Sequence, residues 1–406
     1  MSGPLGQVKV LDMSRILAGP WAAQILGDLG ADVIKVERPG VGDDTRTWGP
    51  PYLKDTSGSE THESAYYLAV NRSKRSITVD MKQKAGQDII RSLAKGSDVV
   101  IENYKVGTLA TLGLGYEDMR RINPRLVYCS ITGFGQTGPK KQLAAYDFAI
   151  QALGGLMSVT GERDNVPGGG PQKVGVPIVD LMTGNYAAIA ILAALAGRSV
   201  SGVGEYLDIA MLDVQVGMLA NQAMNYLISG IVPRRTGNSH PNIQPQDVYE
   251  CSDGQIAIAV GNDAQFEKFC EVLGLPELSA DDRFTRNSAR VRHLGELKPV
   301  IAGVLATRSR AAWVECFEAA MIPCGPIHSI DEVFEDEQVK ERGMRVEVAH
   351  PLSGLLPQVL SPMRFTNSPL QFERRPPLLG EHTEEILYEL GMDESEIGEL
   401  RDSGVI

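Results

Sequence analysis

One aspartate stands where a carboxylate could do covalent chemistry. Asp180 follows a β-branched apolar run, residues 176–179, and precedes an apolar helical run, residues 181–196. This pattern predicts an extended segment that passes into a helix at the carboxylate. Aspartate is a preferred helix N-cap because its side chain accepts the free amide hydrogens of the first turn. The local pattern leaves two interpretations open, a structural cap and a nucleophile.

The chain before Asp180 alternates between predicted strands and helices. Apolar runs predict buried strands at 8–13, 33–37, 76–81, 99–103 and 126–131, and intervening patterns predict helices at 20–28, 84–95 and 116–122. Residues 204–212 predict a further strand. Such alternation favours an α/β fold with a mostly parallel, Rossmann-like doubly wound sheet. Ligands bind at the carboxyl ends of the strands in such sheets.

Cations and amide donors follow three of these predicted strands. They are Arg38 and Arg46 after the second strand, Lys82 after the third, and Asn103, Tyr104 and Lys105 after the fourth. Each one alone is typical of a solvated surface side chain. Their repetition at one edge of a parallel sheet, in an acidic protein, predicts a pocket for a phosphorylated ligand.

A glycine motif follows the strand predicted at 126–131. Gly133, Gly135 and Gly138 have the G-x-G-x-x-G spacing of a dinucleotide-binding loop. However, Pro139 follows where a continuous helix is required, and no strand-ending acid lies at the expected distance. The glycines therefore do not favour NAD binding. We interpret them as positions where the backbone passes close to a ligand.

Length and composition limit the fold and the partners. A chain of 406 residues, 43% hydrophobic and 22% charged, predicts a soluble protein of two or three domains. The polar, proline-rich segment 232–245 marks a change of character. We therefore predict a large domain, 1–225 with 330–406, and a smaller α/β domain, 226–329.

Charge, cysteines and histidines exclude several classes of function. A net charge of −12 argues against binding nucleic acid or an anionic membrane. The apolar run 187–196 is half the length of a membrane span, and no signal peptide is apparent at the N-terminus. Five scattered cysteines fit a reducing cytoplasm. No ligand spacing among the six histidines indicates a metal site.

The chain as a whole resembles the family III CoA-transferases, also called the formyl-CoA transferase and carnitine CoA-transferase (CaiB/BaiF) family. The resemblance rests on VLDMSRILAGPWAAQILGDLGADVIKVERPGVGD, NRSKRSITVDMK, DVVIENY, NPRLVYCSITGFGQTGP, YDFAIQALGGLMSVTG, IPCGPI and PLLGEHTEEIL, in this order. It covers essentially the whole length and lies nearest to the succinyl-CoA:dicarboxylate branch. It implies a large domain completed by the C-terminal tail, and an interlocked homodimer.

The resemblance implies that Asp180 is the nucleophile. In this family the segment that matches VGVPIVDLMTGNYAA carries an aspartate that attacks the acyl-CoA thioester. A mixed anhydride forms first, an aspartyl-CoA thioester follows, and the acceptor acid then takes the CoA. Because aspartate has a reference pKa near 3.9, we expect Asp180 to be ionised at neutral pH.

The resemblance also implies which residues bind CoA. With the strand-edge Lys105, they are Leu17, Ala18, Arg38, Val79, Asp80, Met81, Lys82, Asn103, Tyr104, Tyr146 and Asp147. Three positions depart from the formyl-CoA enzyme. Thr111 and Ala144 replace basic residues, and residues 240–245 replace a glycine-rich loop, which argues against oxalate or formyl-CoA as substrate.

Two alternatives to a CoA-transferase stay open at this point. An α-methylacyl-CoA racemase shares the fold, but it uses a histidine where this chain has Tyr146. A non-catalytic CoA-binding protein would not depend on Asp180. For a transferase we expect CoA and acyl-CoA as substrates, no tightly bound cofactor, succinyl-CoA as donor and a small dicarboxylic acid as acceptor. Arg46, Arg72 and His240 could contact the distal carboxylate.

Overall fold

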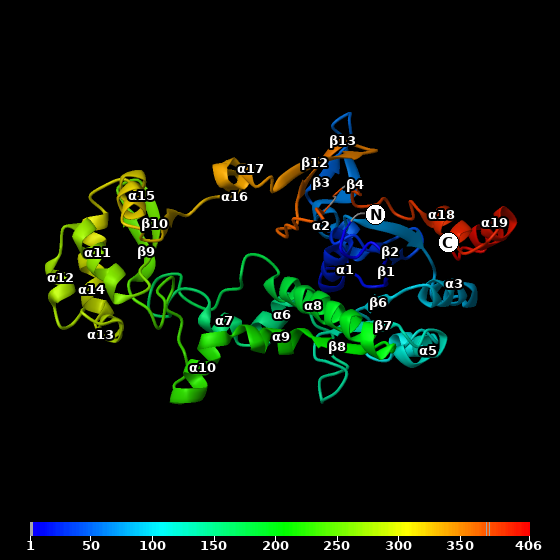
Figure 1. Ribbon diagram of the computed structural model, residues 1–406, viewed down its shortest axis with the longest axis horizontal. Coiled ribbons are helices and arrows are strands. Elements are labelled where there is room, and N and C mark those ends of the chain that lie inside the picture. Colours follow the sequence, from blue (N-terminus) through cyan, green and yellow to red (C-terminus); the bar gives the residue numbers. More distant parts are fainter. Residues whose placement is uncertain (1–2, 371, 373) are drawn as a thin grey trace. The chain divides into compact units, whose positions relative to one another are not determined.

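A parallel sheet forms from the alternating apolar segments. In the computed structural model, which describes residues 3–370, 372 and 374–406, six strands pair in the order β5-β2-β1-β6-β7-β8 (Figure 1). All five pairings are parallel. The strands are β1 (Lys9–Asp12), β2 (Asp32–Glu37), β5 (Lys74–Thr78), β6 (Val99–Glu102), β7 (Val127–Thr132) and β8 (Tyr206–Ala210). The predicted α/β class with a large parallel sheet is confirmed.

Helices cover both faces of this sheet. Successive side chains of a strand point to opposite faces, and in β1 Val10 and Leu11 belong to two different apolar clusters. The cluster of Val10 includes side chains of α1 (Ala18–Asp28) and α8 (Ile178–Ser201). The cluster of Leu11 includes side chains of α3 (Lys84–Lys95), α5 (Tyr116–Ile122), α18 (Thr383–Glu389) and α19 (Glu394–Asp402). Burial on both faces explains why these strands are apolar at consecutive positions.

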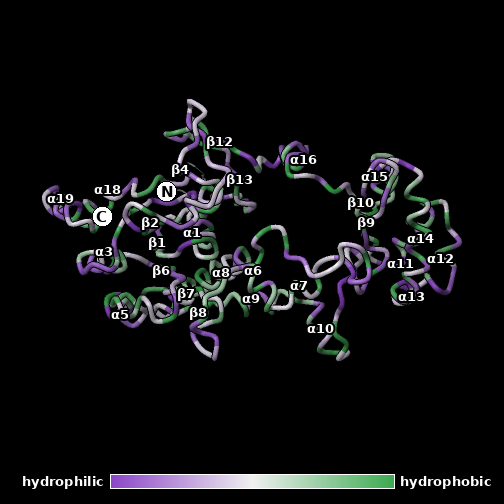
Figure 2. The backbone as a smooth tube through the Cα atoms, turned by 180° about the vertical axis from the view of Figure 1, so that it is seen from behind, coloured by the Kyte–Doolittle hydropathy of each residue, from purple (hydrophilic) through white to green (hydrophobic). Residues whose placement is uncertain are grey.

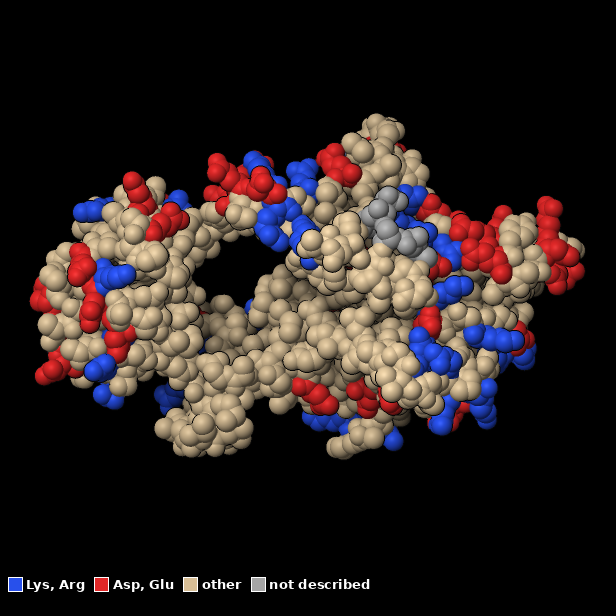
Figure 3. All heavy atoms as spheres, in the orientation of Figure 1, with Lys and Arg blue, Asp and Glu red and all other residues tan. Residues whose placement is uncertain are grey.

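The C-terminal tail covers the outer edge of β5. Ser76 N donates to His382 Nδ1 at 3.2 Å, and His382 N donates back to Ser76 O at 2.9 Å. Thr78 N donates to Thr383 Oγ1 at 3.1 Å. The Arg75 guanidinium also forms ion pairs with carboxylates of α18. Figure 3 shows acidic side chains gathered over α18 and α19. The tail thus satisfies backbone groups of an edge strand.

Two compact units divide the chain. The larger contains residues 1–155, 174–223 and 338–406, and the smaller contains 156–173 and 224–337. The smaller unit takes in residues 156–173, which the sequence analysis assigned to the large domain. The predicted boundaries of the folding domains stay predictions.

Further short elements belong to the larger unit. The apolar pattern did not predict two antiparallel hairpins. They are β3 (Tyr52–Lys54) with β4 (Glu60–Ser64), between β2 and β5 in sequence, and β12 (Arg345–His350) with β13 (Gly354–Val359), after the last strand of the sheet. The remaining helices are η1 (Asp44–Thr47), α2 (Ala65–Val70), α4 (Thr108–Thr111), α6 (Asp147–Leu153) and α9 (Met211–Met218). Two helices cross the boundaries between units, α10 (Ala220–Ser229) and α17 (Glu337–Glu341).

The smaller unit is built on an antiparallel sheet in the order β11-β10-β9. Its strands are β9 (Gln246–Cys251), β10 (Gly254–Ala259) and β11 (Cys324–Pro326). Its helices are α7 (Leu156–Val159), α11 (Asp263–Leu273), α12 (Glu277–Ala280), α13 (Asn287–Arg292), α14 (Leu294–Leu305), α15 (Arg310–Ala319) and α16 (Ile330–Glu335). Phe266, Phe269, Trp313 and Phe317 form the centre of its apolar core.

The helix α8 extends well beyond the apolar run 187–196 that lies within it. By length and composition α8 could cross a membrane, and it is the one helix in the described part of the chain that meets this test. Figure 2 shows apolar residues over most of its length. Ala187, Ala188 and Ile191 are buried in the cluster shared with α1. Packing against α1 and the sheet accounts for these buried residues, whereas Ile189 of the same helix is 62% exposed.

Candidate active site

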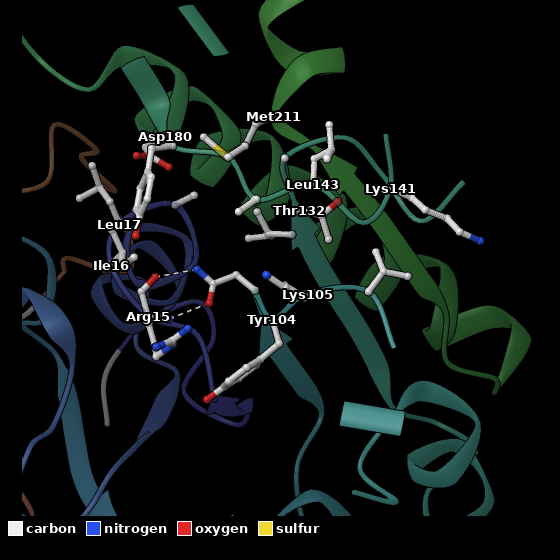
Figure 4. A pocket seen from close by; sticks show the side chains of 18 residues that line it. Arg15, Ile16, Leu17, Tyr104, Lys105, Thr132, Lys141, Leu143, Asp180 and Met211 are labelled. Atoms are coloured by element: carbon white, nitrogen blue, oxygen red, sulfur yellow. Dashed lines mark hydrogen bonds between the residues drawn. The ribbon is translucent and has the colours of Figure 1, made fainter. Parts of the chain in front are cut away.

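A cavity of about 230 Å³ lies at the carboxyl ends of β1, β6 and β7 (Figure 4). Figure 4 shows Asp180 at one end of this cavity, with Arg15 and Tyr104 at the other. Seven of the residues predicted for the site line it together, namely Leu17, Ala18, Asn103, Tyr104, Lys105, Tyr146 and Asp180. They come from four separate segments of the chain, which the parallel sheet brings to one edge.

Asp180 lies inside the first turn of α8 and does not precede the helix. The helix begins at Ile178, with Pro177 in the N-cap position. The free amides of this turn bind a remote carboxylate, because Asp147 Oδ2 accepts from Val179 N at 2.7 Å and from Asp180 N at 3.2 Å. The predictions of an extended segment through Val179 and of Asp180 as N-cap are therefore wrong. The side chain of Asp180 is left free of the cap.

Asp147 acts behind Asp180 and does not line the cavity. It begins α6 and is 9% exposed. The Gln151 side-chain amide, one turn later, donates to Asp147 Oδ1, while its oxygen accepts from Val174 N at 2.9 Å. Asp147 was predicted to contact CoA. In the structure its carboxylate instead accepts hydrogen bonds from the amides at the amino end of α8. These bonds fix the helix turn that carries Asp180.

Burial changes the acidity of Asp180. The side chain is 8% exposed, and this burial, followed by the charge of Asp147, raises the pKa of Asp180 to about 7. A helix N-terminus supports an anion by only about 0.3–1 kcal/mol, which is less than one pKa unit. Burial and like charge therefore prevail over the helix. The expectation that Asp180 is fully ionised at neutral pH is wrong, because it neglected both effects.

In the wall opposite Asp180, the Asn103 side chain bonds to both backbone groups of Arg15. Asn103 Oδ1 accepts from Arg15 N at 2.8 Å, and Asn103 Nδ2 donates to Arg15 O at 2.6 Å (Figure 4). The Arg15 guanidinium lies over the Tyr104 ring, 5.1 Å from its centroid. It also forms a 2.9 Å ion pair with Asp44, which pairs with Arg38 at 2.7 Å. One carboxylate thus holds two guanidinium groups at the carboxyl end of the sheet.

A second group of predicted CoA residues lies outside this cavity lining. Arg38 follows β2, and residues 79–82 follow β5, its neighbour in the sheet. Val79 is buried in the apolar core, Asp80 and Met81 are half-buried, and Lys82 is exposed. The backbone of Asp80 donates to Val405 O at 2.7 Å, so the tail holds this loop. The prediction that these residues contact CoA stays a prediction.

Two of the three predicted substrate contacts are contradicted. Arg46 is 5% exposed, and its guanidinium binds Glu37 and Glu63 at 2.8 and 2.9 Å. Arg72 is also buried, and it forms a short bidentate ion pair with Asp28. Both donors are engaged inside the protein, so neither arginine can meet a substrate carboxylate at this cavity. His240 belongs to the smaller unit, and its role stays a prediction.

The sequence analysis missed several residues of the lining. Arg15 and Ile16 directly precede the predicted pair Leu17 and Ala18, so their place after β1 could have indicated them. Thr132, Lys141 and Met211 also line the cavity. Lys141 follows the glycine motif, for which the sequence analysis considered only the glycines themselves.

The glycines of this motif serve close packing. Gly133 lines the cavity, and a Cβ there would lie 2.3 Å from the Cβ of Ala145. Gly135 and Gly138 have φ angles of 83° and 82°, which favour glycine.

Among the described residues, no group of three or more His, Cys, Asp or Glu side chains is placed to hold a metal ion.

Comparisons with known proteins place the chain among the CoA-transferases. A model of CoA-transferase family III matches residues 5–383. The chain is 48% identical over 387 residues to a succinate–glutarate CoA-transferase of Agrobacterium fabrum, covering 95% of this chain and 96% of that one. It is 43% identical over 404 residues to the human succinyl-CoA:glutarate CoA-transferase, covering 99% and 90%. A crystal structure of a CaiB/BaiF family protein from Brucella suis, 47% identical, matches with a TM-score of 0.84 over 96% of this chain and 100% of that one.

Proposed function

The chain belongs to CoA-transferase family III and is a CoA-transferase, and we propose that it moves CoA from succinyl-CoA to a small dicarboxylic acid through a covalent intermediate on Asp180. The observation that carries this proposal is the single buried carboxylate at the end of the cavity. Asp180 lines the cavity while the neighbouring Asp147 is engaged with the helix amides. A carboxylate without a hydrogen-bonded task is available as a nucleophile.

The proposed reaction proceeds through four carboxylate and thiolate exchanges. An Asp180 oxygen bonds to the thioester carbonyl carbon, the C–S bond breaks, and CoA leaves as a thiolate. The thiolate then attacks the Asp180 carbonyl and expels the donor acid, which leaves an aspartyl-CoA thioester. The acceptor carboxylate then attacks the aspartyl-CoA carbonyl and releases the thiolate, which leaves a second mixed anhydride. The thiolate attacks the acceptor carbonyl of this anhydride, which gives the acceptor-CoA thioester and regenerates Asp180. Each exchange conserves the activated acyl bond, provided that the cavity excludes water.

The intermediate can be trapped and mapped. Protein incubated with succinyl-CoA and then treated with borohydride should be reduced at one carboxyl group, and peptide mass spectrometry should place the change at Asp180. Asp180→Asn keeps the size of the side chain but removes the nucleophile, so it should give no modified peptide and no transfer. Asp213→Asn changes an exposed carboxylate in the first turn of α9 and serves as the matched control. Modification at another carboxylate in the wild-type protein would refute the assignment.

The acceptor class is supported by the relatives and by charge. The two relatives described above carry glutarate in their names. With Arg46 and Arg72 excluded, the cationic side chains that line the cavity are Arg15, Lys105 and Lys141. Initial rates with succinyl-CoA should be measured against glutarate, other dicarboxylic acids and monocarboxylic acids of equal length. Faster transfer to the monocarboxylic acids would contradict the proposed acceptor.

We also propose that the chain forms the interlocked homodimer that the family resemblance implied. Large apolar side chains are exposed at the end of α10 and just after it, with Leu227, Ile228, Ile231 and Val232 between 68% and 79% exposed. A contiguous apolar segment of this kind is typical of an interface. Light scattering should give twice the mass of the chain, and a monomer at micromolar concentration would contradict the proposal.

A further inference from the structure

Ile16 has a backbone conformation that its side chain disfavours. Its φ angle is 72°, in the left-handed region, where a β-branched residue is a genuine outlier. It lies between β1 and the start of α1, and it lines the cavity. Such a conformation persists only where the surrounding structure enforces it.

Asp43 enforces this conformation from outside the cavity lining. Both of its carboxylate oxygens accept from Ile16 N at 3.2 Å. The same carboxylate binds Lys35 Nζ at 2.8 Å, and both charged side chains are completely buried. Thr45 completes the set with donors at 3.0 Å from N and 2.8 Å from Oγ1. Ile16 is thus held by a buried ion pair whose carboxylate accepts several hydrogen bonds.

The ion pair is permanent across the working range of pH. Burial pushes the pKa of Asp43 up, but Lys35 and the Thr45 donors prevail and lower it to about 2. Lys35 Nζ also donates to Ser14 O at 3.0 Å, two residues before Ile16. The pair therefore fixes both ends of the turn that leads from β1 into α1.

The direction of this turn sets the wall that faces Asp180. Leu17 and Ala18 follow Ile16, line the cavity and form the amino end of α1. The helix of Asp180 packs directly on this end, because a Cβ on Gly184, one turn after Asp180, would lie 2.7 Å from Ala18 O. The amino end of α1 carries the positive end of a helix dipole, which suits the negative charge that develops on a thioester oxygen.

We propose that the buried Lys35–Asp43 pair is a positioning device for the transfer reaction, which holds Ile16 in the left-handed conformation and thereby aims the amino end of α1 at the carbonyl attacked by Asp180. The inference rests on the proposed function. It assigns a role to two residues that touch neither the cavity nor the reacting atoms.

A double-mutant cycle at Asp43 and Ile16 tests the proposal. Glycine adopts positive φ without strain, so an Ile16→Gly protein no longer needs Asp43 to hold the turn. Asp43→Asn should lower kcat about 10- to 100-fold when Ile16 is present, which is less than the roughly 100- to 1,000-fold loss for a removed oxyanion donor because the donor is displaced and not removed. In the Ile16→Gly background the same change should lower kcat less than about threefold, because the two sites are coupled.

Two further variants separate positioning from stability. Asp28→Asn breaks another buried ion pair, with Arg72, away from the cavity, and it should lower thermal stability but not kcat. If Asp43→Asn fails to fold, Lys35→Met/Asp43→Asn removes both charges together and leaves no unpaired ion. That double variant should show the same loss of kcat and the same relief by Ile16→Gly.

Hydrogen exchange gives a readout that does not depend on catalysis. The peptide containing residues 13–22 should exchange faster in Asp43→Asn than in the wild type or in Asp28→Asn. Unchanged exchange in this peptide, a folded Asp43→Asn protein with wild-type kcat, or an equal loss of kcat with and without Ile16→Gly would each overturn the proposal. If the wild type transfers no CoA, the proposed function has failed, and the exchange experiment alone decides whether Asp43 holds the turn.

Discussion

The raised pKa of Asp180 should make the stability of the protein depend on pH through this one residue. The unfolded chain ionises Asp180 near its ordinary pKa of 3.8, whereas the folded protein ionises it at about 7. Between these values the folded state binds the extra proton, so stability falls as pH rises through this window. At pH 8 both states are ionised, and the folded state bears the full cost of the buried charge.

The size of the effect follows from the shift. About three pKa units at 1.4 kcal/mol each amount to a cost of roughly 4 kcal/mol at pH 8, and to little at pH 4. Asp180→Asn carries no charge at either pH. The difference in free energy of unfolding between Asp180→Asn and the wild type should therefore rise by about 1.4 kcal/mol per pH unit from pH 4 to pH 7, and then level off.

Urea unfolding of the two proteins at several pH values, at one protein concentration, measures this difference. Asp213→Asn is the control, because its carboxylate is exposed and should leave the profile of the wild type unchanged. Parallel profiles for Asp180→Asn and the wild type would refute the reasoning, since burial and Asp147 would then not raise the pKa of Asp180.

Three other experiments test the packing of α8 on α1, the buried ion pairs of Arg46 and the ionisation of Asp180. Gly184→Ala places a Cβ 2.7 Å from Ala18 O, so it should destabilise the protein by about 1–3 kcal/mol in urea unfolding, and wild-type stability would contradict the close approach of α8 to α1. Arg46→Met leaves Glu37 buried without its partner and should cost about 3–5 kcal/mol in the same measurement, whereas an unchanged free energy would argue for an exposed, substrate-facing arginine. Because only the ionised carboxylate attacks, kcat/KM for the acyl-CoA should fall about tenfold per pH unit below the Asp180 pKa of about 7, and a profile flat down to pH 5 would contradict that pKa.

Sequence patterns were sufficient for the sheet because its strands are apolar on both faces. They placed β5 at 76–81, two residues late, because Lys74 and Arg75 begin the strand. Lys74 is fully buried and paired with Asp12 at 2.9 Å. A pattern treats lysine as exposed, and the partner that neutralises it is 62 residues away in the chain.

The same limit explains the errors at the candidate site. Arg46 and Arg72 were assigned to a substrate because their types suit a carboxylate, but the carboxylates they bind are inside the protein. The cap interpretation of Asp180 was wrong because the carboxylate that binds the free amides of α8 belongs to Asp147, 33 residues earlier. Residue types and strand ends thus predicted which segments meet. Which charges pair among them depends on contacts across the fold, and these are not apparent from local spacing.

The tail that covers β5 has a consequence for synthesis of the chain. Ser76 lies 306 residues before His382, so the edge of β5 leaves the ribosome long before the groups that satisfy it. At roughly 5–20 residues per second, that edge waits about 15–60 s for its partner. During this time Arg75 places a positive charge at the bare strand, which discourages pairing with a neighbouring nascent chain. The Arg75 guanidinium later forms ion pairs with the tail carboxylates. One side chain thus first opposes pairing at the edge strand and then helps to bind the tail that covers it.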